Sequence, residues 1–274
     1  NKKSTKEYLR FTEAQQNGAV IDWANYKPVE PAFTGTKILD EYPLAEIAEY
    51  IDWQPFFIAW EMHGKFPAIL SDSIIGVEAT KLYNDAKQLL QQLIDEKWLQ
   101  AKGVVGFWPA NKIDHDTVDV DNSSAITKLE FLRQQVKKTA GQPNLSLADF
   151  IAPAEQNYQD HIGAFSVTIS GIEKHIKKFE AGHDDYNKII LQALADRLAE
   201  AFAECLHLKT RKEYWGYATD EHLTNDELIH EKYLGIRPAP GYPACPDHTE
   251  KYKLFDLLNA TETVGMTLTE NLAM

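Results

Sequence analysis

The sequence is poor in cysteine and has no long apolar segment. Its two cysteines, Cys205 and Cys245, are too few to build a disulfide framework in a chain of 274 residues. No apolar run approaches the roughly 20 residues that a helix needs to cross a bilayer. The start, NKKSTKEYLRFTEAQQ, is polar and lacks the apolar core of a signal peptide. These features argue against a membrane partner and favour a cytoplasmic protein.

Positive charge is also in short supply. Lys and Arg number 28 against 41 Asp and Glu, which gives a net charge of −13. No cluster of Lys and Arg with aromatic residues between them occurs in the sequence. Because nucleic-acid binding relies on such clusters to neutralise phosphates, we expect no nucleic-acid partner.

Apolar material for a core is plentiful. Hydrophobic residues make up 44% of the chain and aromatic residues 11%, which suits one large domain. Residues 1–40 carry scattered apolar positions without a helical or strand period. We interpret them as an extended arm or linker that lies on the body through Trp23, Tyr26 and Phe33. The domain itself is expected over residues 41–274.

Sequence patterns predict helices in four places. Apolar residues recur at alternating steps of four and three over 74–99, and a second long apolar stripe begins near Asp184. Thr224 and Glu227 form a capping box, which predicts a short helix over 225–233. The segment 126–138, ITKLEFLRQQVKK, is also interpreted as a helix.

Strand patterns lie between these helices. The apolar run 103–108 and the alternating run 116–121 predict an antiparallel pair, and the segments 146–152 and 161–170 add further strand-like material. Helices and hairpins therefore mix without a regular strand-helix-strand repeat. This pattern is typical of an α+β domain with an antiparallel sheet.

The segment GIRPAPGYPACPDHTEK, residues 235–251, can form neither a helix nor a central strand. Its four prolines lack amide donors and fix φ, so the segment should be a rigid loop with unpaired backbone groups. Arg237 offers a planar fork for a carboxylate, and Tyr242 offers a ring face and a hydroxyl. Such an inventory suits a ligand in which an amino acid is joined to a nucleoside.

The same segment carries a Cys-x-x-His spacing, Cys245 and His248. Half of a zinc site is one interpretation, but no second cysteine pair exists and the nine histidines are scattered singly, so we expect no metal site. A thiol beside a base is the other. A free-standing hydrolase or thiol-nucleophile enzyme using Cys245 and His248 therefore stays open as an alternative function.

The run EKYLGIRPAPGYPACPDHTEK closely resembles the signature of the reactivation domain of cobalamin-dependent methionine synthases, whose R-x-x-x-G-Y element appears as Arg237, Gly241 and Tyr242. The similarity extends from about residue 40 to the end, through YIDWQPFFIAWEMHGKFP, GVVGFWPAN and IGAFSVT. It implies a curved single α+β domain with a twisted antiparallel sheet and flanking helices. It also implies that the domain binds S-adenosylmethionine.

The resemblance assigns roles to individual residues. Asp52 would hold the ligand's α-amino group and Arg237 its carboxylate, while Tyr242 and the backbone around Ala244 would line the sulfonium and the adenine. From the residues alone, Asp52 could equally be a helix cap and Arg237 a surface ion-pair partner. No residue is expected to act as a catalytic group.

Two further acidic residues, Glu200 and Glu231, match positions that would offset the sulfonium charge, and otherwise they would be solvated surface residues. The family continues past the position of Met274 with a strand and a Tyr-Tyr pair that touches the ligand. We therefore expect a domain that is C-terminally truncated relative to the family.

The implied function is methyl donation for reductive methylation of cob(II)alamin. Cobalamin would be carried by the cobalamin-binding module of the same polypeptide, and zinc would belong only to an absent module. A flavodoxin-like or other flavoprotein would supply the electron, although a net charge of −13 fits poorly with an acidic flavodoxin unless a local basic surface exists. The chain alone is expected to be inactive.

Overall fold

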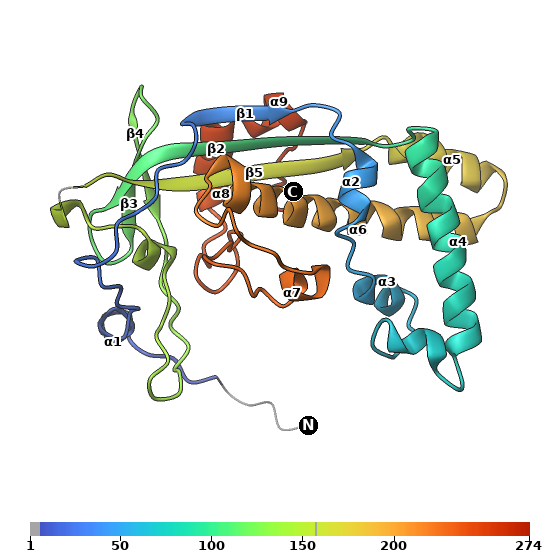
Figure 1. Cartoon of the computed structure of the whole chain (residues 1–274), viewed down its shortest axis with the longest axis horizontal. Helices are drawn as coiled ribbons and strands as arrows, with labels where there is room; N and C mark the ends of the chain where they lie inside the picture. The colour runs from blue at the N-terminus through green and yellow to red at the C-terminus, as the bar shows by residue number, and fades with distance from the viewer. Residues whose placement is uncertain (1–5, 157) are drawn as a thin grey trace.

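The computed structural model describes residues 6–156 and 158–274, and its centre is an antiparallel sheet of five strands (Figure 1). The strands are β1 (Gly35–Leu39), β2 (Gln100–Lys112), β3 (Thr117–Asp121), β4 (Ile126–Glu130) and β5 (Asp160–Ser170). Strand β5 pairs with β2 from residue 100 to residue 110. Since a strand has two edges, β1 and β3 follow one another along the other edge of β2.

Helices cover the sheet and extend beyond one end of it (Figure 1). The α-helices are α1 (Phe11–Gln16), α2 (Leu44–Ala48), α3 (Gln54–Ala59), α4 (Gly76–Asp95), α5 (Ile172–Ala181), α6 (Asp185–Lys209), α7 (Asn225–Ile229), α8 (Glu250–Leu258) and α9 (Ala260–Val264). Short 3₁₀ turns are η1 (Ala68–Ser71), η2 (Leu147–Phe150) and η3 (Ala154–Gln156), and η4 (Thr210–Tyr214) is a π-helical turn. No helix in the described ranges is both long enough and apolar enough to span a membrane.

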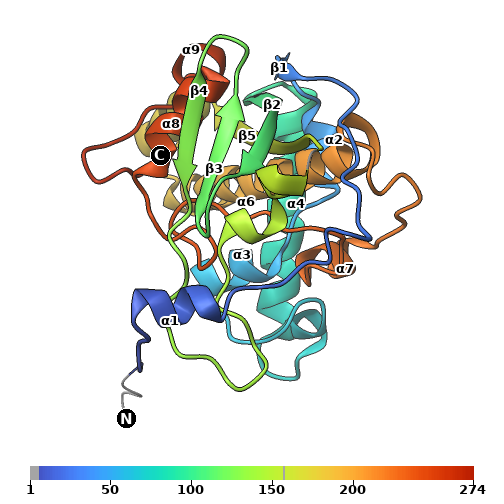
Figure 2. The ribbon, with the colours of Figure 1, turned by 90° about the vertical axis from the view of Figure 1, so that its left-hand side faces the viewer.

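Strand β2 separates two hydrophobic cores because its successive side chains point to opposite faces. Val105 and Phe107 belong to a core shared with α2, α3, α4 and α6, whereas Val104 and Trp108 belong to a second core with α8 and α9. Figure 2 looks at the end of the sheet where β3 and β4 stand beside α8 and α9. Gly103 lets β2 approach α6, since a Cβ there would lie 3.0 Å from the ring of Phe202.

Several sequence-based predictions are confirmed. The long helix expected over 74–99 is α4, the apolar stripe after Asp184 forms α6, and the strands expected over 103–108 and 116–121 pair as β2 and β3. The capping box is also formed, because the Thr224 side chain accepts from the backbone of Glu227. Its helix, α7, is shorter than the predicted 225–233. The expected α+β class, with an antiparallel sheet and flanking helices, is correct.

The helix predicted over 126–138 is wrong. Residues 126–130 form β4, whose buried Leu129 faces Val118 across the β3 hairpin. The pattern ITKLEFLRQQVKK fits both a helical and an alternating period, and tertiary pairing decides for the strand.

The strand-like interpretation of 146–152 is also wrong. Ser146 begins the 3₁₀ turn η2, and its hydroxyl accepts from the amide of Ala148. The carboxylate of Asp149 accepts in return from the amide of Ser146, so this short polar cap determines the conformation in place of a sheet ladder.

The expected N-terminal arm is only partly extended. Residues 1–5 lie outside the described part of the chain, while α1 and β1 give regular structure to two later stretches. Phe33 packs edge-on against Phe107 with ring centroids 5.1 Å apart, and the hydroxyl of Tyr158 donates to the carbonyl of Trp23 at 2.7 Å. The segment therefore contacts the body where expected, and its last residues form part of the sheet.

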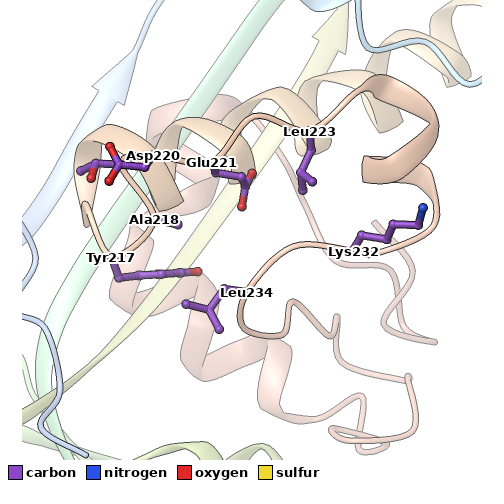
Figure 3. A pocket seen from close by; sticks show the side chains of 8 residues that line it. Tyr217, Ala218, Asp220, Glu221, Leu223, Lys232 and Leu234 are labelled. Carbon is purple, nitrogen blue, oxygen red and sulfur yellow. The ribbon is translucent and has the colours of Figure 1, made fainter.

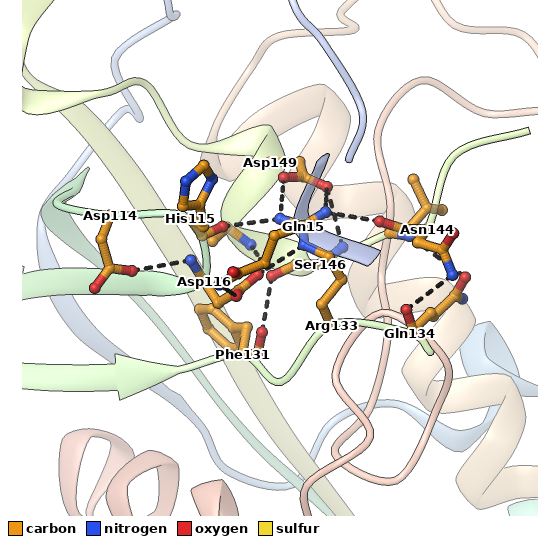
Figure 4. Close-up of polar contacts among 12 residues, drawn as sticks. Gln15, Asp114, His115, Asp116, Phe131, Arg133, Gln134, Asn144, Ser146 and Asp149 are labelled. Carbon is orange, nitrogen blue, oxygen red and sulfur yellow. Dashed lines mark hydrogen bonds and ion pairs between the residues drawn. The ribbon is translucent and has the colours of Figure 1, made fainter. Parts of the chain in front are cut away.

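Arg133 ties the irregular segment after β4 to the hairpin (Figure 4). Its side chain is almost fully buried, and its guanidinium binds both oxygens of Asp149 at 2.6 and 2.7 Å. The remaining donors reach Asp116 at 2.8 Å, the carbonyl of Asn144 at 2.7 Å and the carbonyl of His115 at 2.8 Å. All of its N–H groups are therefore used.

We expect Arg133→Ala to lower the free energy of unfolding by about 3–5 kcal/mol, because it leaves Asp116 and Asp149 buried without their cation. Urea denaturation followed by circular dichroism measures this change. The matched control is Lys128→Ala, which removes an exposed partner of Asp119 and should cost about 0–1 kcal/mol. Similar losses for the two variants would contradict the importance of the buried network.

Candidate functional site

The proline-rich segment folds into a compact loop held by its own backbone. The amide of Gly241 donates to the carbonyl of Cys245 at 2.8 Å, and the amide of Cys245 donates to the carbonyl of Tyr242 at 2.9 Å. Gly241 has a φ of 107°, and a Cβ at this position would collide with the imidazole of His248. Glycine is thus required here by both backbone conformation and space.

Arg237 leaves this loop and reaches helix α6. One of its terminal nitrogens, Nη2, donates to Oε2 of Glu204 at 3.0 Å, and the side chains are 28% and 13% exposed respectively. Nε of Arg237 and Oε1 of Glu204 are buried and have no hydrogen-bond partner among the described residues. The pair is therefore held by a single hydrogen bond, and one buried nitrogen of Arg237 and one buried oxygen of Glu204 have no partner in the described part of the chain.

A second buried ion pair lies where α6 changes into η4. Arg211 is fully buried, and its guanidinium donates to Oε1 of Glu221 at 2.6 Å and to Nδ1 of His207 at 2.7 Å. The guanidinium also lies 4.3 Å from the ring centroid of Tyr233. Burial, followed by the charges of Arg211 and Arg237, lowers the pKa of His207 to about 2, so its imidazole is neutral and Nδ1 is the acceptor.

The other predicted site residues have different surroundings. Asp52 is partly buried before α3, where its Oδ1 accepts from the amide of Gln54 at 2.9 Å. Glu231 is exposed after α7, and its charge acts on Glu204. Tyr242 is 64% exposed, while Ala244 is buried and its carbonyl accepts from the amide of Leu147 at 2.8 Å.

No side-chain hydrogen bond or ion pair in the described part of the chain joins two of the predicted site residues. Helices α3 and α7 both lie on the side of α6 away from the sheet (Figure 1). Glu200 lies one turn before Glu204 on α6 and is exposed. The start of α7 is bound to the start of α3, because the side-chain amide of Asn225 donates to the carbonyl of Ile51 at 3.3 Å. Arg237 is paired instead with Glu204, which is not one of the predicted residues.

A cavity of about 350 Å³ opens beside the Arg211–Glu221 pair (Figure 3). It is lined by Tyr217, Ala218, Thr219, Asp220, Glu221, Leu223, Lys232 and Leu234. None of the predicted site residues lines it, so the cavity is separate from the Arg237 contact. Within the described residues, no group of three or more His, Cys, Asp and Glu side chains is placed to hold a metal ion.

Comparison with known proteins decides the family. A sequence model described as "Vitamin B12 dependent methionine synthase, activation domain" matches residues 43–274. The chain belongs to this family. A solved structure, described as the MetH reactivation domain bound to AdoHcy, superimposes with a TM-score of 0.90 at 47% sequence identity. The match covers 97% of this chain and 83% of that one. The resemblance noted in the sequence is therefore confirmed.

Membership in the activation-domain family does not support the alternative thiol enzyme, and the structure gives a physical reason. Cys245 is 2% exposed within the core formed by β2, α8 and α9. Burial raises the pKa of its thiol to about 12, whereas a nucleophilic cysteine needs a lowered pKa. His248 is exposed and packs on Gly241.

Sequence reasoning did not identify Glu204 as a partner of Arg237. A signal for it was available, because Glu200, Glu204, His207 and Arg211 follow one another at steps of four, three and four along one side of the helix. Of these residues, Glu204 contacts Arg237, and the charge of Arg237 acts on His207. Their pairing with Arg237 and Glu221 could be seen only in the folded activation domain.

We expect both thiols of the activation domain to resist Ellman's reagent in the native state. Burial raises the pKa of Cys205 to about 11 and that of Cys245 to about 12, so neither forms appreciable thiolate at mildly alkaline pH. Absorbance after mixing measures the reaction, and unfolding in guanidinium chloride should release both thiols. The control is Val20→Cys, at a position 95% exposed, which should react at once. Rapid labelling of native Cys245 would contradict this account.

Proposed function

We propose that this chain binds S-adenosylmethionine and presents its methyl group for reductive methylation of cob(II)alamin. The observation that carries the proposal is the 47% identity, over 97% of the chain, to a reactivation domain described as bound to AdoHcy. The AdoHcy of that structure is the product that remains when S-adenosylmethionine has lost its methyl group. A domain that holds this product fits the methyl donor as well.

Arg237 is proposed as the partner of the ligand's carboxylate. Its buried Nε has no partner within the described part of the chain, and a buried donor without an acceptor costs about 1–3 kcal/mol. A ligand carboxylate would supply the missing acceptor and would form a charge-assisted hydrogen bond. The free donor therefore supports the assignment that the family resemblance implies.

Asp52 is proposed as the partner of the ligand's ammonium group. Its Oδ1 caps α3 through Gln54, which fixes the carboxylate in place and leaves Oδ2 for a cation. The helix-cap interpretation and the ligand-binding interpretation are therefore compatible for this residue. A carboxylate and a guanidinium that faced one site from opposite sides would match the two charges of an amino acid.

The remaining assignments concern the sulfonium and the adenosyl part. Glu200 and Glu231 are exposed acids that would offset the positive sulfonium. Tyr242 offers an exposed ring to lie along the ligand, and the buried backbone at Ala244 forms a firm wall behind it. These roles are proposals that follow from the family resemblance.

The chain's contribution to the reaction would be positioning. The sulfonium is already an activated methyl donor, so the residues bind and orient it, and no general base is required. Cobalamin would be held by a neighbouring module of the same polypeptide and would supply the methyl acceptor. A reduced flavoprotein as electron donor and a cytoplasmic location belong to the same proposal. Without the other modules the chain should show no turnover.

Replacement of Arg237 tests the carboxylate contact. We expect Arg237→Ala to weaken S-adenosylmethionine binding by about 10- to 100-fold, since a hydrogen bond to a charged group contributes about 1.5–3 kcal/mol. Isothermal titration calorimetry measures the affinity, and Arg10→Ala, an exposed arginine outside the matched residues 43–274, is the control. Equal affinity of Arg237→Ala and the unchanged chain would refute the assignment.

Replacement of Asp52 tests the ammonium contact. We expect Asp52→Asn to weaken S-adenosylmethionine and S-adenosylhomocysteine by the same factor, about tenfold, because both ligands carry the same ammonium group. Asparagine can still accept from the Gln54 amide, so the cap is kept. The control is Asp72→Asn, another aspartate whose Oδ1 accepts from backbone amides before a helix. A larger loss for S-adenosylmethionine alone would place Asp52 near the sulfonium.

A further inference from the structure

The contact between Glu204 and Arg237 joins two segments that are 33 residues apart in sequence. Glu204 belongs to the rigid helix α6, whereas Arg237 belongs to the irregular chain after α7. A long arginine side chain on a loop loses considerable rotamer freedom when it is fixed. An anchor on α6 would remove part of that freedom before any ligand binds.

The contact with Glu204 leaves Nε of Arg237 without a hydrogen-bond partner in the described part of the chain. Of the guanidinium nitrogens of Arg237, only Nη2 donates a hydrogen bond to Oε2 of Glu204, at 3.0 Å. Nε is buried without a partner in the described ranges. The guanidinium is therefore held at one end and keeps a donor for a second anion. A bidentate pair with Glu204 would have used both groups.

The segment that leads to Arg237 is packed against helix α6 and the turn that follows it through Tyr233. The ring of Tyr233 lies 4.3 Å from the guanidinium of Arg211 and meets the imidazole of His207 edge-on, with centroids 4.7 Å apart. Tyr233 precedes Arg237 by four residues, so this packing fixes the segment just before the arginine. Glu204 and His207 themselves lie one turn apart on α6.

We propose that Glu204 is a positioning residue that holds Arg237 so that Nε faces the ligand's carboxylate. The proposal rests on the function proposed above and adds to it a residue that does not itself touch the ligand. Glu204 acts only through Arg237. Its loss should therefore matter only for ligands that have a carboxylate.

Glu204→Gln tests the proposal, with binding measured by calorimetry for S-adenosylmethionine and for decarboxylated S-adenosylmethionine. We expect affinity for S-adenosylmethionine to fall about tenfold and affinity for the decarboxylated ligand to stay unchanged. Glu204→Asp keeps the charge and should recover part of the loss. Glu262→Gln, an exposed acid on α9, is the control.

The pH dependence of binding gives a second readout. Desolvation raises the pKa of Glu204, the charges of Arg237 and Arg211 oppose this effect, and those of Glu231 and Glu221 add to it. The ion pair exists above the pKa of Glu204 and is lost as pH falls through it. Affinity for S-adenosylmethionine should therefore decline on acidification, from a higher pH than an ordinary glutamate would give. In Glu204→Gln this part of the decline should be absent.

The outcomes separate this inference from the proposed function. Equal losses for both ligands in Glu204→Gln, or no loss for either, would overturn the positioning role. If Arg237→Ala weakened S-adenosylmethionine binding and Glu204→Gln did not, the proposed function would stand and this inference would fall. If the unchanged chain bound neither ligand, both would fall together.

Discussion

The packing of helix α6 against strands β2 and β5 is the contact on which the rest of the structure depends. Leu194, Leu198 and Phe202 are fully buried in the core that includes Val105 and Phe107 of β2. Helices α2, α3, α4 and α5 all contact α6 as well. The apolar face of α6 therefore fixes how this helix lies on the sheet and, with it, the direction in which its polar side faces. Because the neighbouring helices pack on α6, it also sets their positions.

Near the C-terminal end of α6, ionisable side chains are buried, and a buried charge without a partner destabilises a fold. His207 and Arg211 are buried, Glu204 is mostly buried, and the chain beyond Lys209 continues as a π-helical turn. Turns of this type occur often at functional sites. Arg211 is paired and hydrogen-bonded, whereas the buried Nε of Arg237 has no partner among the described residues. This difference is the reason for proposing Arg237, and not Arg211, as a ligand contact.

Much of the fold follows from local sequence patterns. The apolar periods of α4 and α6, the apolar run of β2, the alternation of β3 and the capping box before α7 are all local signals, and each was predicted correctly. Strand β4 was not, because the pattern ITKLEFLRQQVKK suits a helix equally well until Leu129 meets Val118 across the hairpin. Pairing between separate segments decides such cases.

The residues of the candidate site also differ in how far the sequence alone could predict them. Arg237 could be identified from its proline-rich surroundings and its family resemblance, since both are properties of one short segment. Glu204 could not be linked to it, because the contact forms only when the chain after α7 returns to α6. Asp52 illustrates a third case, in which one carboxylate has both a cap role that the structure describes and a ligand role that stays a prediction.

A crystal structure of this chain with S-adenosylhomocysteine would test the central claim most directly. The account predicts that the ligand's carboxylate lies within hydrogen-bonding distance of Nε of Arg237, with Nη2 still bound to Glu204. A ligand seated in the cavity lined by Tyr217 and Leu234, or an Arg237 whose Nε as well as Nη2 donates to Glu204, would contradict it.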